Sequence, residues 1–550
     1  MKRAIVLLVL VFSLCFVLSV MLGACENSGG VTPTKPSTSE TADGTTGDTT
    51  TGDTTGETTG ETTEATTEAT TEATTEATTE ATTEPTTKPT TKPTEPTTKP
   101  TTQAPDDPTD PPATKPVETL PDNLSQTEIE EAAAKLVKEA DFIAAGYDYD
   151  KAISMLREFK YYSSVPSFND KIAEYEAGKA TLKKYDKMST ITHIFFHSLI
   201  VDTDRAFGKG SYQPGGYNQW MTTVDEFKFL LEEMYKRGFV LITPYQMAGE
   251  KADGSKFEYR DIYLPEGKTP FIMSQDDLNY YGYMINDKTG TGSTPQFASK
   301  KGDGFASKII IGEDGKPTCE YVDANGNVLV GDYDLVPILE SFIQEHPDFA
   351  YRGARAVLGV TGYEGVFGYR TKPSYEESLG TTRYNKEVAD AKAVAKCLKD
   401  NGWIIASHSY GHPAYGEISA ERVENDSDKW EKTVQPIVGK TDIILYPHGS
   451  DIAGVGKYTT SNEKFNALYA DGYRYFFNVD SNIYWNQLGT NYFRGGRRNV
   501  DGYRMWYSPK KLSDLMGTKV IQYYDKNGNL VERTVSEAFD AARPCPVPQI

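Results

Sequence analysis

Cysteine, histidine and net positive charge are all scarce in this sequence. It has 5 cysteines and 6 histidines among 550 residues, and its formal net charge is -21. Outside the first 24 residues the cysteines lie far apart, at Cys25, Cys319, Cys397 and Cys545, without any C-x-x-C spacing. The sequence therefore predicts neither a zinc knuckle nor a disulfide framework. The negative charge opposes binding to polyanions, so we expect no nucleic-acid partner.

The first residues have the order of a bacterial export signal. "MKRAIVLLVLVFSLCFVLSVMLGAC" has a basic start, an apolar stretch and then small residues. A transmembrane anchor is the alternative, because the apolar stretch is nearly long enough to span a bilayer. The stretch "LGAC" resembles the lipobox of bacterial lipoproteins, in which the cysteine is acylated after cleavage. We expect a signal peptide over 1–24 and a lipidated Cys25 that holds the protein on the extracellular face of the cell membrane.

Two segments precede the main domain. Residues 25–118 are rich in threonine, proline and glutamate and have almost no large apolar side chain. Such a segment cannot offset its ordering entropy by burial, so we expect a disordered, extended linker. Residues 119–187 change to strong helix formers, beginning with Ser125 and Glu128 in capping-box spacing. We expect a small helical segment there and assign it no chemistry.

Residues 188–550 alternate short apolar runs with amphipathic helical patterns, which is typical of a parallel α/β arrangement. In the first unit, Thr223 and Glu226 cap a helix that Gly238 ends. A hairpin insertion is expected near 300–335, and "DANGN" and "DKNGN" are predicted hairpin turns. The strand candidates are "THIFFHSLI", "FVLIT", "TPFIMS", "ARAVLGV", "GWIIAS", "TDIILY" and "YRYFFNV". About seven strands with interleaved helices indicate a barrel, whose active groups stand at the carboxyl ends of its strands.

Polar residues follow several of these predicted strands directly. The candidates are Asp276 and Asp277, then His408 and His412, then His448, and last Asp480. Two imidazoles and a carboxylate on one metal leave positions open for water and substrate, as a catalytic site requires. A second aspartate beside the metal ligand can take protons. The alternatives are a surface histidine pair on a helix and a solvated Asp-Asp turn, but Gly411 and Pro413 disfavour a helix.

The order of these motifs resembles a known family. Asp276-Asp277, then H-S-Y-G-H, then Y-P-H-G are similar to the polysaccharide deacetylases, the NodB-like domain of carbohydrate esterase family 4, over roughly residues 190 to 510. The resemblance implies a distorted (β/α) barrel that removes acetyl groups from a glycan with the help of a metal. It further implies that Asp277, His408 and His412 hold the metal and that Asp276 is the general base. This ligand set accepts several divalent cations, of which we expect zinc.

The sequence departs from the family pattern in three places. Gln275 and Leu278 flank the aspartates where members have an aromatic residue and a glycine. Leu445 stands near the usual place of an arginine that orients the base. Arg497 or Arg498, expected in a later loop, could substitute for it, and we assign Arg498 to the site. The alternative is that both arginines bind another carboxylate or solvent.

The third departure concerns the general acid. Family members commonly end with a leucine-x-histidine whose imidazole supplies the proton, but no histidine follows His448 here. His448 and His197 are the candidate replacements, and His197 could equally be a buried, hydrogen-bonded histidine. Asp480 stands where the family often has an orienting aspartate, with a loop-capping carboxylate as the alternative. Tyrosines in "NYYGYM", "GYEGVFGYR" and "NIYWNQ" also fall near strand ends, where they either stack on sugars or are half-buried in the domain.

Three functional hypotheses follow from these residues. The first is a lipid-anchored enzyme that removes acetyl groups from a cell-envelope or extracellular polysaccharide. The second is a glycan-binding lipoprotein on a catalytically impaired deacetylase scaffold, which the missing final histidine favours. The third is a solute-binding lipoprotein serving a transporter, which would need two similar lobes where the sequence indicates one barrel.

Overall fold

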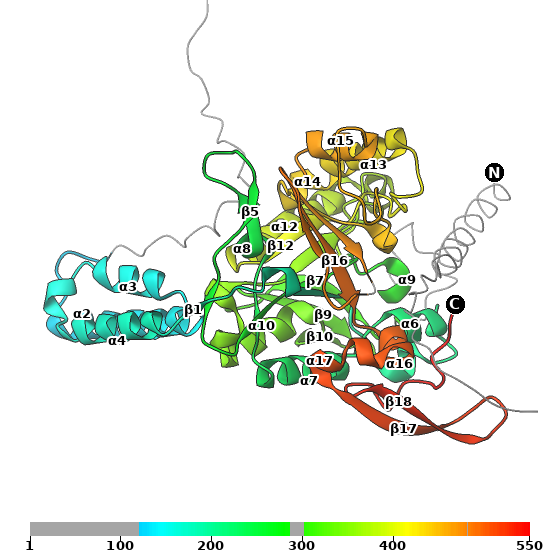
Figure 1. Ribbon diagram of the computed structural model, residues 1–550, viewed down its shortest axis with the longest axis horizontal. Helices are drawn as coiled ribbons and strands as arrows, with labels where there is room; N and C mark the ends of the chain where they lie inside the picture. The colour runs from blue at the N-terminus through cyan, green and yellow to red at the C-terminus, as the bar shows by residue number, and fades with distance from the viewer. Residues whose placement is uncertain (1–119, 286–301, 481) are drawn as a thin grey trace, which may run out of the picture. The chain divides into compact units, whose positions relative to one another are not determined.

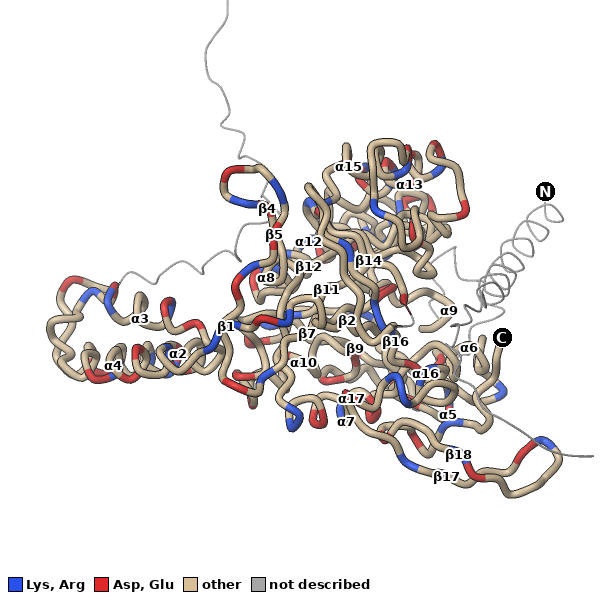
Figure 2. The backbone as a smooth tube through the Cα atoms, viewed as in Figure 1, with Lys and Arg blue, Asp and Glu red and all other residues tan. Residues whose placement is uncertain are grey.

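The structure is a computed structural model that describes residues 120–285, 302–480 and 482–550 (Figure 1). The expected signal peptide, Cys25 and the linker lie outside the described residues. Within the described part, no helix is both long and apolar enough to cross a bilayer. Lysine, arginine, aspartate and glutamate are interspersed over the outer helices and loops (Figure 2).

A closed ring of seven parallel strands forms the centre of the main domain. The ring runs in the order β11-β12-β13-β14-β16-β2-β7, and pairing of Val357 with Ser274 closes β11 onto β7. Its strands are β2 (Thr192–Phe196), β7 (Thr269–Gln275), β11 (Val357–Val360), β12 (Ile404–Ser407), β13 (Ile443–Leu445), β14 (Tyr475–Val479) and β16 (Phe493–Asn499). Only Ser407 and Ile444 pair between β12 and β13, so the ring is irregular there. The expected distorted (β/α) barrel is confirmed.

One strand of the ring differs from the prediction. The run "FVLIT" does form a strand, β3 (Phe239–Leu241), but β3 pairs only with β7 and is not part of the closed ring. Its place is taken by β16, which contains "RGGRR", a stretch expected to be a loop. Every residue of β16 is buried. The prediction was wrong because a strand with three arginines and two glycines has no apolar pattern, yet each arginine is paired with a carboxylate inside the fold.

Helices surround the ring (Figure 1). Helix α7 (Val224–Lys236) begins at a capping box of Thr223 and Glu226 and buries the apolar stripe Phe227, Leu230, Leu231 and Met234, as predicted. Gly238, with φ of 79°, lets the chain turn out of the helix into β3. The other helices of the layer are α10 (Leu335–Glu345), α12 (Thr381–Asp400), α13 (Ala420–Thr433), α15 (Glu463–Ala470), α16 (Gly502–Tyr507) and α17 (Ser513–Met516).

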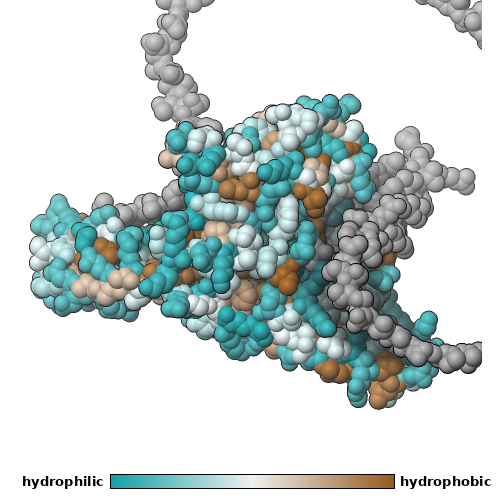
Figure 3. Space-filling view, viewed as in Figure 1, coloured by the Kyte–Doolittle hydropathy of each residue, from teal (hydrophilic) through white to brown (hydrophobic). Residues whose placement is uncertain are grey.

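Two of the antiparallel sheets outside the ring contain the hairpin turns that the sequence predicts. The first is a three-stranded sheet of β8 (Ala306–Ile311), β9 (Pro317–Val322) and β10 (Val328–Gly331), and the second is a hairpin of β17 (Thr518–Tyr524) and β18 (Leu530–Ser536). Asp323 and Asp525 each accept two backbone amides inside the tight turns of these hairpins, so "DANGN" and "DKNGN" are hairpin turns. The β17–β18 hairpin carries apolar side chains on an otherwise largely hydrophilic face (Figure 3).

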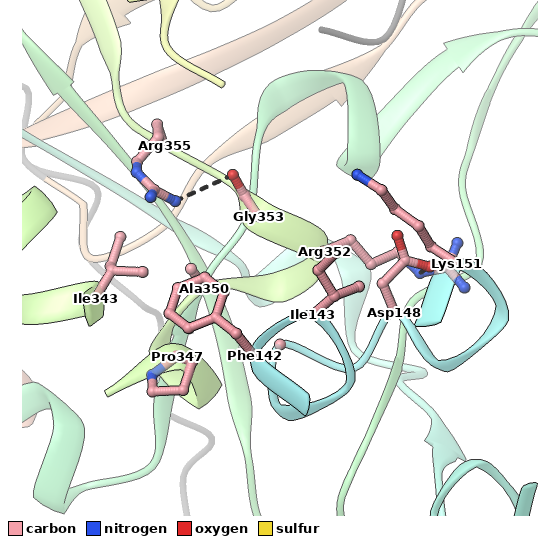
Figure 4. A pocket seen from close by; sticks show the side chains of 11 residues that line it. Phe142, Ile143, Asp148, Lys151, Ile343, Pro347, Ala350, Arg352, Gly353 and Arg355 are labelled. Carbon is pink, nitrogen blue, oxygen red and sulfur yellow. Dashed lines mark hydrogen bonds and ion pairs between the residues drawn. The ribbon is translucent and has the colours of Figure 1, made fainter. Parts of the chain in front are cut away.

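Three helices form the segment before the barrel: α2 (Gln126–Ala145), α3 (Tyr149–Arg157) and α4 (Ser167–Ala180). Ser125 and Glu128 make both hydrogen bonds of a capping box, and the helices share a core of their own. The segment joins the barrel through the Tyr147 hydroxyl, which donates to the Asp348 carbonyl at 3.0 Å. A crevice at this junction is lined by Phe142 and Ile143 on one side and Pro347 and Ala350 on the other (Figure 4).

The end of the chain is held to α7 by a buried ion pair. Arg543 donates to both oxygens of Glu226, at 2.5 and 2.6 Å. Its Nη1 and Nη2 also donate to the backbone carbonyls of Asn218 and Met221. Both side chains of the pair are almost fully buried. Since Glu226 also caps α7, one carboxylate connects the helix start to residues 540–543.

We therefore expect Arg543→Met to lower the free energy of unfolding by about 3–5 kcal/mol, because it leaves the Glu226 charge buried without its partner. Urea unfolding followed by circular dichroism measures this change. Arg157→Met is the matched control. Arg157 pairs with Glu176 on the solvent-exposed surface, so this substitution should hardly change the free energy of unfolding. Equal unfolding midpoints for the two variants would contradict the assigned role of the buried pair.

Candidate functional site

The carboxyl ends of the parallel strands bring the predicted site residues together. Asp276 and Asp277 follow β7, whereas His408 and His412 follow β12. One ligand atom from each of Asp277, His408 and His412 lies within 4.8 Å of the others. The two strands are parallel and lie on either side of β11 in one ring, so these ends open at the same mouth.

The backbone at this mouth adopts an unusual conformation. Asp277, Ser409, His412 and His448 have φ between 56° and 62°, in the left-handed region that side chains other than glycine seldom occupy. Such positions cost free energy and persist only where the surroundings hold them. The loop with both histidines is therefore not the regular helix considered as the alternative.

Asp426 of α13 holds the loop that carries the histidines. Its carboxylate accepts the amides of Tyr410 and Gly411 at 2.8 and 2.9 Å and the hydroxyl of Tyr415 at 3.0 Å. The amide of His412 in turn donates to Ser409 Oγ at 2.9 Å. Sequence analysis did not find Asp426, because nothing in the pattern of α13 distinguishes it from the other acidic residues of that helix.

The hydrogen bonds of His408 and Asp277 orient their remaining ligand atoms toward His412. Nδ1–H of His408 donates to the Leu445 carbonyl at 2.7 Å, so its Nε2 faces His412 Nε2 at 3.2 Å. Asp277 accepts the Tyr281 hydroxyl at 2.6 Å on one oxygen, and its other oxygen lies 3.7 Å from His412 Nε2. Burial lowers the pKa of His412 to about 3, although Asp277 opposes the shift, so its imidazole is neutral and can donate a lone pair.

These features fit a divalent metal. Two imidazole nitrogens and one carboxylate oxygen converge, and a backbone carbonyl and a tyrosine hydroxyl fix the outer side of two of the three groups. Catalytic zinc sites use three protein ligands of this kind and orient them through such outer partners. The donor set therefore fits the ligand assignment implied by the family resemblance.

The Asp276 carboxylate has different partners from the Asp277 carboxylate. One of its oxygens accepts from Arg497 at 2.5 Å, and the other lies 3.9 Å from His408 Nε2. Burial raises the pKa of this carboxyl, but the Arg497 guanidinium and His408 outweigh burial and lower it to about 2. Asp276 is therefore ionised and oriented beside the metal-type ligands.

Arg497, and not Arg498, reaches the site. Successive side chains of a strand point to opposite faces, so the Arg498 side chain points away from the barrel interior. It donates to both oxygens of Asp514 at 2.8 and 3.0 Å and to the Lys511 carbonyl. The geometry thus assigns to Arg497 the orienting position that the sequence analysis gave to Arg498.

The remaining candidates occupy different surroundings. His197 Nδ1 lies 3.2 Å from the Trp220 carbonyl, and the ring is within electrostatic reach of Asp276 and Asp277. His448 Nε2 lies 3.2 Å from the His412 carbonyl, and its ring is exposed. Asp480 accepts the Asn482 amide at 2.7 Å, as a loop-capping carboxylate does. His197 and His448 therefore flank the ligand group, whereas Asp480 caps the loop after β14.

Gln275, one of the departures from the family pattern, has a structural explanation. Its side chain points away from Asp276 and donates to both oxygens of the buried Asp334 at 3.1 and 3.0 Å. The Tyr280 hydroxyl also donates to Asp334, which caps α10. An aromatic side chain at position 275 would leave this buried carboxylate with one donor fewer.

The geometry predicts one strong zinc site. Loss of a residue that only orients a metal ligand weakens metal binding by roughly 10- to 100-fold. We expect His408→Ala to weaken zinc binding by more than this, because it removes a ligand. Calorimetry on the metal-stripped protein measures this. Asp428→Asn is the control, since Asp428, Glu431 and Asp471 form a second group of suitable spacing. Loss of zinc in the control, with retention in His408→Ala, would refute the assignment.

Comparison with known proteins gives a family match. Residues 380–474 match the family described as polysaccharide deacetylase. No curated protein matches the chain. A solved structure, Streptococcus pyogenes deacetylase PplD in complex with acetate, is similar at 12% identity with a TM-score of 0.28, over 60% of this chain and 97% of that chain. The matched family segment contains α12, β12, His408, His412 and β13, so this part of the chain is similar to that family.

Proposed function

We propose that the protein is a metal-dependent hydrolase that removes acetyl groups from a polysaccharide. The observation that carries the proposal is the convergence of Asp276, Asp277, His408 and His412 at one end of the barrel. The family match supports it, because the matched segment contains both histidines. Asp276 and Asp277 lie outside that segment and enter the proposal through their geometry alone.

Asp277, His408 and His412 would hold the cation, for which zinc is our choice. A divalent cation there would lower the pKa of a water molecule and polarise the acetyl carbonyl. Asp276 is the general base, since Arg497 keeps it ionised and directed toward the ligand group. Arg497 is a positioning residue in this scheme, and its burial in β16 leaves it little freedom to move.

Two histidines are candidates for the general acid, which must protonate the leaving group. His197 uses Nδ1 on the Trp220 carbonyl, so its Nε2 is the atom that would carry a proton to the substrate. His448 follows β13, on a turn where Gly449 is needed because φ is 65° and a Cβ would lie 2.4 Å from that of Val479. Both are retained as candidates, and their variants distinguish them.

The location and domain organisation belong to the same proposal. We place the enzyme on the extracellular face of the cell membrane, anchored by lipid on Cys25 after removal of 1–24. Residues 25–118 would act as linker, 119–187 as the helical segment and 188–550 as the catalytic domain. The support is the sequence order of these segments, and it favours a cell-envelope or extracellular polysaccharide as substrate.

A catalytically impaired glycan-binding lipoprotein is the second candidate. It is favoured by one specific observation, the absence of any histidine after His448. Under this alternative the barrel would bind an acetylated glycan without turning it over.

We expect the protein to release acetate from acetylated chitin oligomers or acetylated xylan, and a chelator to abolish the release until zinc is restored. Asp276→Asn should lower kcat by roughly 10²- to 10⁴-fold, because it removes the proton acceptor. Enzymatic assay of free acetate measures both effects. The same assay on His197→Ala and His448→Ala identifies the proton donor as the variant with the larger fall in kcat.

Asp314→Asn serves as control for the acetate assay, since Asp314 is exposed in the β8–β9 turn and should leave the rate unchanged. Binding of zinc and glycan by the wild type, without acetate from either N- or O-acetylated substrates, would instead favour the glycan-binding alternative.

The two neighbouring arginines provide a further prediction. Arg497→Met should lower kcat by about 10²-fold, because misplacement of a catalytic group by about an ångström has a cost of that order. Arg498→Met should mainly lower the unfolding midpoint, since it breaks the pair with Asp514. Measurement of kcat and of urea unfolding on both variants separates the two roles. A larger loss of kcat in Arg498→Met would contradict the assignment.

A further inference from the structure

Two tyrosine motifs that lie far apart in the sequence meet beside Asp277. Tyr281 and Tyr283 come from "NYYGYM" after β7, and Tyr363 comes from "GYEGVFGYR" after β11. The Tyr281 ring stacks on Tyr363 at 4.8 Å between centroids with 10° between planes, and on Tyr283 at 5.7 Å with 16°. The three rings therefore form one nearly parallel group.

This group is directly connected to the candidate metal ligands. The Tyr281 hydroxyl donates to Asp277 at 2.6 Å and lies 2.8 Å from Thr361 Oγ1. Burial and the charge of Asp277 raise the pKa of Tyr283 well above its ordinary value, so Tyr283 also lies within electrostatic reach of that carboxylate. A ligand that reaches the metal site would thus meet these rings.

The three tyrosines differ in exposure. Tyr281 is almost fully buried and its hydroxyl donates to Asp277, so contacts within the fold account for this side chain. Tyr283 and Tyr363 are half-buried and keep part of their surface open. Both rings pack partly against a core cluster, and Tyr212 also contacts Tyr283 at 5.0 Å between centroids. The part of each ring that stays open beside the mouth is the surface available to a ligand.

The loops that carry the rings are tied to each other. Glu364, next to Tyr363, accepts the Gly282 amide at 2.8 Å. Asn279 donates to the Thr361 carbonyl at 2.9 Å, and its own side-chain oxygen accepts the Thr361 amide at 3.1 Å. The rings are therefore held in place before a ligand arrives, which reduces the entropy lost on binding.

We propose that Tyr283 and Tyr363 form a sugar-stacking subsite that holds a pyranose ring of the substrate beside the metal ligands. The proposal rests on the proposed deacetylase function for the identity of the reacting group. A pyranose presents flat C–H faces that pack on aromatic rings, while its hydroxyls stay with polar groups. Small acetyl esters lack such a face, so the subsite would make the enzyme prefer acetylated glycans to simple esters.

The test compares kcat/KM on N-acetylglucosamine oligomers with that on ethyl acetate, which has no ring that could stack on the tyrosines. Tyr363→Ala and Tyr283→Ala should each lower the ratio of the two values by roughly five- to tenfold, as loss of one aromatic contact implies. Tyr363→Phe and Tyr283→Phe should keep the ratio, because phenylalanine retains the ring. Tyr524→Ala, on the distant and exposed end of β17, is the matched control and should leave both values unchanged.

Equal losses on the two substrates, or a Phe variant as weak as its Ala counterpart, would overturn the subsite, because either result indicates a structural role. If the wild type releases no acetate at all, the proposed function fails and the subsite is tested separately. Calorimetry then measures binding of the same oligomers to the wild type and to Tyr363→Ala. Weaker binding by the variant supports the subsite, and unchanged or absent binding overturns it.

Discussion

The buried ion pair between Arg497 and Asp276 is the interaction on which both the closed barrel and its mouth depend. Arg497 comes from β16, the strand between β14 and β2 that completes the ring. A buried guanidinium without a carboxylate is strongly destabilising, so β16 can lie inside the fold only because carboxylates face it. Asp451 and Asp514 do this for Arg494 and Arg498. Asp276 does it for Arg497, and the same contact keeps Asp276 ionised for the chemistry that we propose.

The ligand group depends in the same way on groups from other elements. A carbonyl of β13 fixes His408, a carboxylate of α13 holds the loop that carries both histidines, and the Tyr281 hydroxyl fixes Asp277. Left-handed backbone at Asp277 and His412 is sustained by this network. Such supporting contacts orient metal ligands before the metal binds, and they explain why the site consists of residues with few alternative positions.

The tyrosines beside Asp277 extend this arrangement outward. Tyr281 belongs to the support of the ligand group, whereas Tyr283 and Tyr363 stack with it and keep open surface. Aromatic rings as well as His197 and His448 thus lie near the ligand group. A site with aromatic and polar groups suits a sugar that bears an acetyl group, which is consistent with a polysaccharide as the proposed substrate.

The sequence by itself determined the elements whose signals are local. Capping boxes at Ser125 and Thr223, apolar strands and the polar residues that follow them were all predicted, because propensity and hydrophobic pattern act over a few residues. Only the tertiary structure decided that β16 is a strand, that Arg497 rather than Arg498 reaches Asp276, and that Asp426 supports the histidine loop. These outcomes depend on strand register and on carboxylates distant in the chain. An ion pair between strands that are distant in the sequence produces no local sequence pattern around either of its residues.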